Sequence, residues 1–197
     1  MIPLSIPNIS GNELKYVKDC LDTGWISSAG EYVNKFEEAI QSYTGAKYAI
    51  ACMNGTAGLQ VSLILAGVTK NDIVIAPNLT FVATLNAISY VSAQTVLIDN
   101  CEDSWQIDVD LLEKWLIKNT TTIIGDKPIT IEKLSGKKVG AIMPVYVLGG
   151  FVNTDKLLKI STKYGIPIIE DSTEALGSFT KGKHAGTFGL TGGVSFN

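Results

Sequence analysis

The chain has 197 residues, of which 46 % are hydrophobic, 18 % charged and 8 % aromatic. A chain of this length buries roughly 70 % of its unfolded surface, so we expect one good-sized domain or two small ones and exclude a second large domain. The net charge is −3, and every basic residue is a lysine. Because the arginine forks that recognise phosphates and guanines are absent, we expect no nucleic-acid partner.

Metal and membrane chemistry are also disfavoured. The cysteines Cys20, Cys52 and Cys101 have no metal-ligand spacing, and the only histidine is His184. We therefore expect reduced thiols and neither a metal site nor a disulfide framework. The first residues lack the pattern of a signal peptide, and no stretch approaches the ~18 apolar residues that span a bilayer. The sequence predicts a soluble cytoplasmic protein without a membrane partner.

Helical periodicity and short apolar runs alternate along the chain. Apolar residues at helical spacing predict helices over residues 13–21, 31–43, 57–66, 81–90, 109–117 and 154–164. Continuous apolar runs predict strands over residues 48–52, 73–76, 95–98, 139–145, 166–169 and 193–196. The polar stretch 119–138 is expected to be a long insertion between two elements. Apolar strands that alternate with helices predict a three-layered α/β fold, in which helices cover both faces of a mostly parallel sheet.

Parallel sheets of this kind bind ligands at the carboxyl ends of their strands. The residues of interest at predicted strand ends are Gly55, Thr56, Phe81, Tyr146, Glu170, Asp171 and Ser195. Gly55 and Thr56 open a helix, where they form a phosphate cup or where Thr56 is only a cap. Phe81, taken alone, is better explained as a core residue. Because burying charge is costly, Glu170 or Asp171 is expected to have a cationic partner or to be a hydrogen-bonded cap.

Thr56, Phe81, Asp171 and Ser195, in this order, resemble the cofactor constellation of the DegT family of pyridoxal-phosphate (PLP) sugar aminotransferases. The resemblance extends over the whole chain, through the segments IPLSIPNISGNE, LDTGWISSAGEYVNKFEEAI, NGTAGL, PNLTFVATLNAI, IIEDSTEALGS, GKHAGTFG and SFN. It implies the aspartate aminotransferase-type fold, which is the large domain of fold type I, with PLP as the cofactor. The chain resembles in particular the enzymes that aminate the 4-keto group of UDP-linked 4-keto-6-deoxy-hexosamines for bacterial glycans.

The resemblance implies a role for each cofactor-binding residue. Gly55 and Thr56 would hold the PLP phosphate through backbone N–H groups and a hydroxyl at a helix N-terminus, and Ser195 would add a second hydroxyl. Phe81 would stack on the pyridine ring. Asp171 would pair with the protonated ring nitrogen and so keep the cofactor an electron sink.

Further residues are placed by the same resemblance, and two of them depart from the family pattern. Glu174 stands near the phenolic oxygen of the ring, where many relatives have glutamine, and Tyr146 stands in a substrate-facing loop, where many have histidine. Trp25 and Ser28 match a segment that lies near the substrate. Glu174 as a helix cap and Trp25 as a packing residue remain alternatives. His184 lies in a turn-like run and is expected to be an exposed turn residue.

The end of the sequence carries a further expectation. In the family, the strand ending in S-F-[HN] is followed by two residues and then by the lysine that forms the Schiff base with PLP, whereas this sequence ends at Asn197. The resemblance therefore implies that residues 1–197 are the PLP-binding large domain, truncated before that lysine and without the C-terminal small domain. The chain would then hold no catalytic residue and be inactive alone, because the amine is both the covalent anchor and the acid–base group.

Two other functions remain open: a non-catalytic remnant that acts through partner contacts, and a PLP-dependent sugar dehydratase, which in this family has histidine in place of the lysine. A Rossmann dehydrogenase is disfavoured, because no GxGxxG follows the first strand. The implied partners of an aminotransferase are a nucleotide sugar, an amino acid donor and a second copy in a homodimer. In that fold a later antiparallel strand lies between residues 48–52 and the strand ending at Phe196, so we expect the chain alone to be marginally stable and prone to associate.

Overall fold

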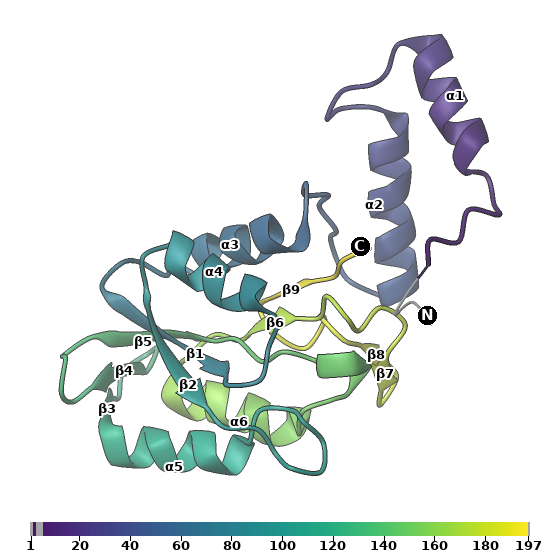
Figure 1. The fold of residues 1–197 in the computed structure, drawn as a ribbon. Coiled ribbons are helices and arrows are strands. Elements are labelled where there is room, and N and C mark those ends of the chain that lie inside the picture. The colour runs from purple at the N-terminus through teal and green to yellow at the C-terminus, as the bar shows by residue number, and fades with distance from the viewer. Residues whose placement is uncertain (1, 3–5, 197) are drawn as a thin grey trace.

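The computed structural model describes residue 2 and residues 6–196 (Figure 1). Its helices are α1 (Glu13–Thr23), α2 (Glu31–Thr44), α3 (Gly55–Leu65), α4 (Val82–Tyr90), α5 (Val109–Asn119), α6 (Thr154–Tyr164) and a 3-10 turn, η1 (Val147–Gly149). Its strands are β1 (Asp72–Pro77), β2 (Gln94–Ile98), β3 (Thr120–Ile123), β4 (Ile129–Glu132), β5 (Lys138–Ile142), β6 (Ile169–Asp171), β7 (Phe179–Thr180), β8 (Lys183–His184) and β9 (Thr191–Gly193).

A run of parallel strands forms the centre of the molecule. β1 pairs in parallel with β2 on one side and with β5 on the other. β6 pairs in parallel with β9, and single parallel bridges, Ile142 with Ile168 and Val145 with Asp171, connect the β5 segment to the β6 segment. The parallel order is therefore β2, β1, β5, β6, β9. The mostly parallel sheet predicted from the sequence is confirmed.

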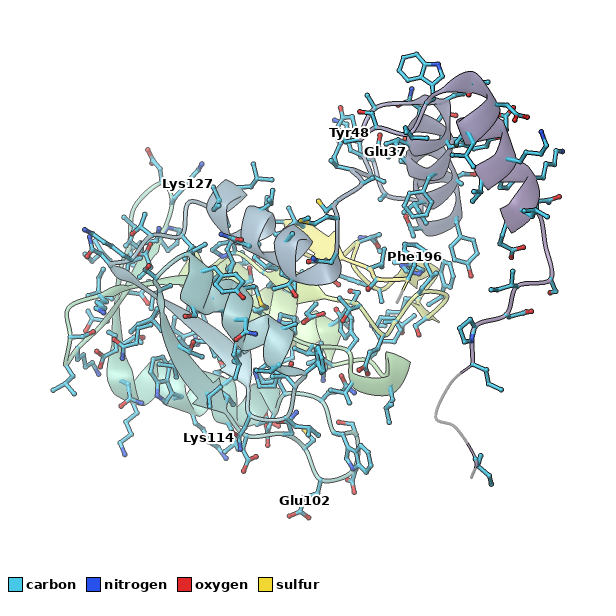
Figure 2. The ribbon with its side chains drawn as sticks, turned by 45° about the horizontal axis from the view of Figure 1, so that its top comes forward. Glu37, Tyr48, Glu102, Lys114, Lys127 and Phe196 are labelled. Carbon is cyan, nitrogen blue, oxygen red and sulfur yellow. The ribbon has the colours of Figure 1, made fainter. Side chains whose placement is uncertain are left out.

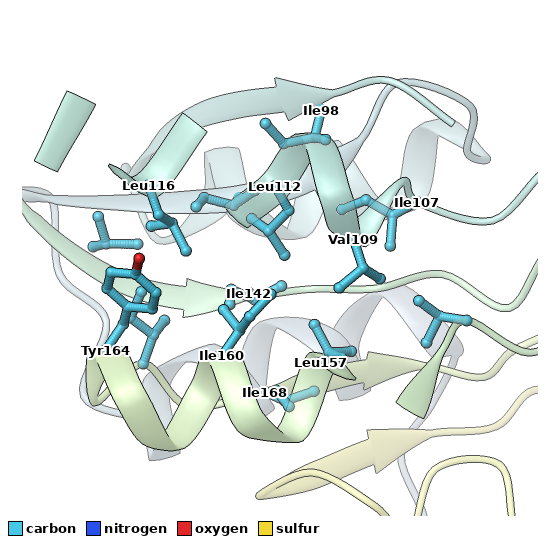
Figure 3. Packing of buried hydrophobic residues seen from close by; sticks show 14 of the residues in the cluster. Ile98, Ile107, Val109, Leu112, Leu116, Ile142, Leu157, Ile160, Tyr164 and Ile168 are labelled. Carbon is cyan, nitrogen blue, oxygen red and sulfur yellow. The ribbon is translucent and has the colours of Figure 1, made fainter. Parts of the chain in front are cut away.

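Each face of this sheet is covered by its own pair of helices. Along β1, Ile73 and Ile75 belong to the core under α5 and α6, whereas Val74 and Ala76 belong to the core under α3 and α4. This alternation follows from the two-residue side-chain period of a strand, and it explains why β1 is apolar throughout. Figure 3 shows Leu112 of α5 and Ile160 of α6 meeting in the first core. The three-layered α/β architecture is thus also confirmed.

The stretch 119–138 is not the insertion that its polarity predicted. β3 and β4 form an antiparallel hairpin, and the pair Ile131–Lys138 joins it to the start of β5. Thr130 is buried, and its hydroxyl donates to the carbonyl of Tyr164 at 2.6 Å. The threonines read as polar in the sequence, but their hydroxyls are satisfied within the fold, so they are compatible with strand positions.

Residues 48–52 do not form the predicted strand. Within this segment, the backbone N–H of Ala51 donates a hydrogen bond to Glu37 Oε1 on α2, at 2.8 Å. Tyr48 is 70 % exposed and lies beside the arm that carries Glu37 (Figure 2). A strand is stabilised by pairing with a neighbour, and the apolar run of residues 48–52 has no strand partner among the described residues.

His184 is not the exposed turn residue that the sequence predicted. It is fully buried in the β7–β8 hairpin, and its Nε2 accepts the N–H of Gly177 at 2.9 Å. Its ring lies edge-on to Tyr43 of α2 and Phe179 of β7, with ring centroids 5.9 and 5.0 Å away. The local pattern did not show this, because Tyr43 lies on α2, far away along the chain, and Phe179 meets His184 only once β7 and β8 pair.

α1 and α2 form an arm that projects from the α/β body (Figure 1). α1 buries none of its residues, whereas the end of α2 reaches the body through Tyr43. The ring of Phe36 on α2 also meets Phe196 edge-on, at a centroid distance of 5.0 Å. Among the described residues, no helix combines the length and the apolar character needed to cross a membrane.

Candidate functional site

Asp171 is the central residue of the site. It ends β6, is only 3 % exposed, and accepts hydrogen bonds through both carboxylate oxygens. Thr84 of α4 donates to Oδ2 at 2.6 Å. Thr173 donates to Oδ1 through its hydroxyl at 2.7 Å and its backbone N–H at 3.3 Å. These donors fix the carboxylate at the carboxyl end of the sheet, and none of them brings a positive charge to it.

The N-terminus of α4 lies against this carboxylate. Phe81 is the N-cap residue of α4, and its carbonyl accepts the N–H of Thr84 at 3.2 Å. The Phe81 ring is 71 % exposed, so it is not the core residue that it resembled when taken alone. The hydroxyls of Thr80 and Thr84 lie 2.6 Å apart. Phe81 is therefore held one helical turn from the threonine that donates to the buried carboxylate.

The N-terminus of α3 supplies a second part of the site. Asn54 caps the helix by accepting the N–H of Ala57 at 2.9 Å, so Thr56 is not the N-cap. Within the described chain, no hydrogen bond is recorded for the N–H groups of Gly55 and Thr56. Two open N–H groups at the positive end of a helix attract an anion.

Gly55 is also where three segments meet closely. A Cβ placed on Gly55 would lie 3.0 Å from Cγ2 of Thr173 and 3.5 Å from Cβ of Ser195. The glycine therefore allows α3 to approach the ends of β6 and β9, and it brings the Ser195 side chain beside the helix N-terminus. The same threonine, Thr173, contacts both Gly55 and Asp171.

These groups fit PLP in their chemistry. An open helix N-terminus with a neighbouring hydroxyl suits a phosphate. A buried carboxylate held by neutral donors suits the protonated nitrogen of a pyridine ring, and an exposed aromatic ring next to it suits stacking. Gly55, Thr56 and Ser195 would thus hold the phosphate of one PLP molecule. Phe81 would cover the face of its ring, and Asp171 would hold its ring nitrogen.

Glu170 precedes Asp171 and points into the opposite core. It is fully buried and accepts four hydrogen bonds: from Tyr146 Oη at 2.6 Å, and from the N–H groups of Gly186, Phe188 and Gly189 at 3.0, 2.7 and 2.5 Å. No cation contacts Glu170 or Asp171 among the described residues. Neither explanation offered by the sequence holds as stated: no cationic partner is found, and in the described chain no helix follows that the carboxylates could cap. Glu170 is satisfied by hydrogen bonds instead, and it ties the loop before β9 to β6.

Tyr146 lies inside the protein. Its side chain is 1 % exposed, and burial together with the charge of Glu170 and the hydrogen bond to it raises the pKa of the phenol well above its ordinary value. Tyr146 therefore stays protonated and donates to Glu170. In this conformation its ring presents no surface to a substrate, unlike the loop position expected from the sequence.

The other predicted residues lie apart from Asp171. Glu174 is exposed, and its Oε2 accepts the N–H of Leu148 at 2.7 Å, so it fastens the η1 turn in the manner of a cap. Leu148 has a positive φ of 52°, a conformation that this bond stabilises. Trp25 and Ser28 lie exposed in the connection between α1 and α2, and the structure does not bring them to the Asp171 group.

Two residues of the site, Thr84 and Thr173, were missed by the sequence reasoning. Thr84 lies inside α4 and not at a predicted strand end, and Thr173 follows Asp171 by two residues. The available signal was a hydroxyl side chain one helical turn after Phe81, which places it on the same edge as the strand ends.

The comparisons with known proteins agree with this geometry. Residues 7–197 match the DegT/DnrJ/EryC1/StrS aminotransferase family. The chain belongs to this family. GDP-perosamine synthase of Caulobacter vibrioides is 35 % identical over 195 residues, which are 99 % of this chain and 47 % of that protein. The resemblance to DegT aminotransferases found in the sequence is thus confirmed.

Solved structures of the DegT/DnrJ/EryC1/StrS family support the fold and the cofactor. The putative sugar aminotransferase Spr1654 of Streptococcus pneumoniae, in its PMP form, superposes with a TM-score of 0.83 at 28 % identity, over 100 % of this chain and 48 % of that one. The same protein is known in a PLP form. A GDP-4-keto-6-deoxymannose-3-dehydratase with bound GDP-perosamine superposes with a TM-score of 0.77 at 26 % identity, over 96 % of this chain and 46 % of that one. The family cofactor is PLP, as the resemblance implied, and the fold is that of the fold type I large domain.

The chain spans about half the length of the relatives that it matches, 47 % of the Caulobacter synthase and 48 % of Spr1654. The shared half carries the helix N-terminus of α3, Phe81, Asp171 and Ser195.

Proposed function

We propose that residues 1–197 form the PLP-binding large-domain part of an enzyme that transfers an amino group to a 4-keto-6-deoxy nucleotide sugar for bacterial glycan synthesis. The observation that carries the proposal is Asp171, a carboxylate that is almost fully buried, has no cationic partner among the described residues, and lies beside an open helix N-terminus. A buried charge of this kind is costly unless a cation completes it, and a protonated pyridine nitrogen is such a cation.

Each group then has one task. The N–H groups of Gly55 and Thr56 and the hydroxyl of Ser195 bind the phosphate, Phe81 covers one face of the ring, and Asp171 holds the proton on the ring nitrogen. PLP supplies an electron sink for the carbon from which the amino group is transferred, and this property depends on the protonated nitrogen. We propose further that Glu174 reaches the phenolic oxygen of the ring, and that Trp25 and Ser28 reach the substrate, only after a change in the conformation described above.

The lysine and the activity of the chain alone are part of the proposal. Around Asp171, the described residues supply hydroxyl, amide and carboxylate groups, and the resemblance places the amine-bearing lysine after Asn197. We therefore expect residues 1–197 by themselves to bind PLP without a covalent link and to transfer no amino group. Borohydride reduction followed by intact-mass analysis tests this, and a pyridoxyl-lysine adduct together with turnover would contradict it.

Two experiments assign the nucleotide of the substrate and the type of reaction. The sequence resemblance favours a UDP-linked sugar, whereas the Caulobacter relative is named for a GDP-linked one. A side-by-side assay of the UDP-linked and GDP-linked sugars with a panel of amino acid donors assigns the nucleotide and the donor. The dehydratase among the solved relatives supports a second candidate, loss of the sugar 3-hydroxyl, and product analysis by mass spectrometry separates that reaction from amination.

The decisive experiment replaces Asp171 in the complete enzyme that the proposal implies, because residues 1–197 alone are expected to transfer no amino group. Asp171→Asn keeps the size of the side chain but removes the negative charge, and its NH₂ group cannot accept on the side where one carboxylate oxygen accepted a threonine hydroxyl. We therefore expect amination to fall by at least a hundredfold. Asp110→Asn, at the start of α5, is the matched control and should leave the rate unchanged. Near-normal amination by Asp171→Asn would remove the proposed role.

We also propose that the protein is a cytoplasmic homodimer. Leu14, Val17 and Leu21 lie on one side of α1 at helical spacing and are mostly exposed, as are Trp25 and Ile26 after it. An apolar stripe of this kind is stabilised when a second copy covers it. Light scattering of Leu14→Glu/Val17→Glu against the unmodified protein tests the proposal, because a dimer held by this stripe should dissociate.

A further inference from the structure

Asp171 depends on two threonine hydroxyls, and each hydroxyl connects it to a different part of the proposed cofactor site. Thr84, on one side, lies one helical turn after Phe81. Thr173 lies on the other side of Asp171, and its methyl group would be 3.0 Å from a Cβ placed on Gly55. The two threonines thus lie between the carboxylate and the residues proposed to hold the ring face and the phosphate.

The hydrogen bonds around Thr84 have a fixed direction. A carboxylate can only accept, so the Thr84 hydroxyl donates its single hydrogen to Asp171 Oδ2, 2.6 Å away. In the 2.6 Å contact between Thr80 and Thr84, Thr80 must then be the donor. Both hydroxyl dipoles therefore point toward Asp171, and Thr84 is fully buried, so water does not replace it.

The two oxygens of Asp171 are not equally supported. Oδ1 accepts both the hydroxyl and the backbone N–H of Thr173, at 2.7 and 3.3 Å. Oδ2 accepts only the Thr84 hydroxyl among the described residues. Loss of the Thr84 hydroxyl would therefore free one oxygen completely, whereas loss of the Thr173 hydroxyl would leave the N–H in place.

We propose that Thr84 is a positioning residue that orients the Asp171 carboxylate toward the ring nitrogen of the cofactor, with Thr173 in a secondary supporting role. The inference rests on the proposed function, since it concerns how the same carboxylate meets the ring. It predicts that Thr84 affects binding only of ligands that have a ring nitrogen for Asp171 to hold.

The test measures dissociation constants of the purified protein for PLP and for 1-deazapyridoxal phosphate, in which a C–H group replaces the ring nitrogen. Thr84→Val keeps the side-chain shape and removes the hydroxyl, so we expect about a tenfold weaker affinity for PLP and less than about a twofold change for the deaza compound. Thr84→Ser should restore the affinity for PLP. Thr173→Val should weaken PLP binding by about threefold and Thr80→Val by about twofold, because each leaves both oxygens of Asp171 with a donor.

The outcomes separate the two claims. An unmodified protein that does not bind PLP would overturn the proposed function, and this inference with it. If PLP binds, an equal loss of both ligands in Thr84→Val would show a merely structural role, and unchanged affinity for PLP would show no role; either result overturns the inference alone. Should Thr84→Val not fold, as judged by circular dichroism, the same comparison of the two ligands in Thr84→Cys decides, because a thiol is a weaker donor of similar size.

Discussion

α1 in the arm and α6 in the body are helices of 11 residues each, and both have an apolar side by their sequence pattern. α6 buries Leu157, Ile160 and Tyr164 against the sheet and α5, whereas α1 buries nothing. The same pattern thus has two outcomes. Periodicity determines that a helix forms and which side is apolar, but another element must be present to cover that side.

The two regions also differ in the burial and hydrogen bonding of their polar side chains. In the body, Glu170 and Asp171 are buried and each is satisfied by several donors. In the arm, Glu37 accepts one N–H, and Tyr32 donates to Asp19 at the surface. Water can replace the arm contacts but not those of the body, so the same substitution should cost more in the body.

The largest expected effect is in the apolar core. Leu112→Ala removes a fully buried side chain between α5 and α6 (Figure 3), and we expect the free energy of unfolding to fall by about 2–5 kcal/mol. When the chain is a monomer, Leu14→Ala, at an 80 % exposed position of α1, should change it by at most about 0.5 kcal/mol. Urea denaturation of both variants, at concentrations where light scattering shows a monomer, measures the difference. Equal losses under these conditions would contradict the prediction.

A smaller effect is expected at the buried carboxylate. Glu170→Gln places an amide NH₂ against backbone N–H groups, so at least one of the four donors loses its acceptor, and we expect a loss of about 2–4 kcal/mol. Glu37→Gln in the arm is the matched control (Figure 2), because it loses one partly exposed acceptor and should cost under about 1 kcal/mol. In Glu170→Gln, amide hydrogen exchange should become faster mainly in residues 186–193. A uniform increase along the chain would argue against a local role of Glu170 in holding this loop.

The next largest loss of stability is expected from removing the hydroxyl of Tyr146. Tyr146→Phe keeps the ring but removes one of the four donors to Glu170, so we expect a loss of about 1–2 kcal/mol. Because the pKa of Tyr146 is raised, an alkaline absorbance titration should show this phenol ionising only when the protein unfolds. Tyr32→Phe in the arm should leave stability unchanged. An amination rate that falls further than the stability loss explains would restore Tyr146 as a substrate contact.

The smallest effect is expected at surface ion pairs. Lys163 and Lys156 of α6 pair with Glu113 of α5 at 3.2 and 3.4 Å, and their hydrogen bonds and charges lower the pKa of Glu113. A pKa that is lower in the folded state adds stability above the unfolded value of about 4.3, and that stability is lost as the pH falls through the folded value. Glu113→Gln should therefore be slightly less stable than the unmodified protein at pH 7 and equal to it at pH 2. A difference that persists at pH 2 would assign the effect to packing.

The helices of the body and the strands β1, β2 and β5 were predictable from the sequence, since the helices are periodic and these strands contain apolar runs. β6 (Ile169–Asp171) and β9 (Thr191–Gly193) are displaced from the predicted strands 166–169 and 193–196, because strand bounds depend on where the two segments pair with each other. The structure of residues 48–52 was not predictable, because an apolar run becomes a strand only when a neighbour pairs with it. The prediction for residues 119–138 was wrong for the opposite reason. Their threonines are polar, yet the hydroxyl of Thr130 donates to the carbonyl of Tyr164, which lies 34 residues later in the chain. Local pattern carries no information about such distant partners.

The site divides in the same way. Gly55, Phe81, Asp171 and Ser195 were named from sequence motifs, and the structure places Gly55 beside Ser195 and Phe81 one helical turn from the threonine that holds Asp171. Thr84 and the hydrogen-bond network of Glu170 were not accessible, because their partners lie on other elements.

The sequence by itself determined the helices of the body with their apolar sides, the order of the strands β1, β2 and β5, and the residue types at the strand ends, because each of these depends on neighbours within a few positions. Only the tertiary structure decided that His184 is buried, that Tyr146 turns inward to Glu170, and that Thr84 reaches Asp171 across 87 residues. These contacts form when the chain closes on itself, and the free energy that selects them comes from burying polar groups together with their partners.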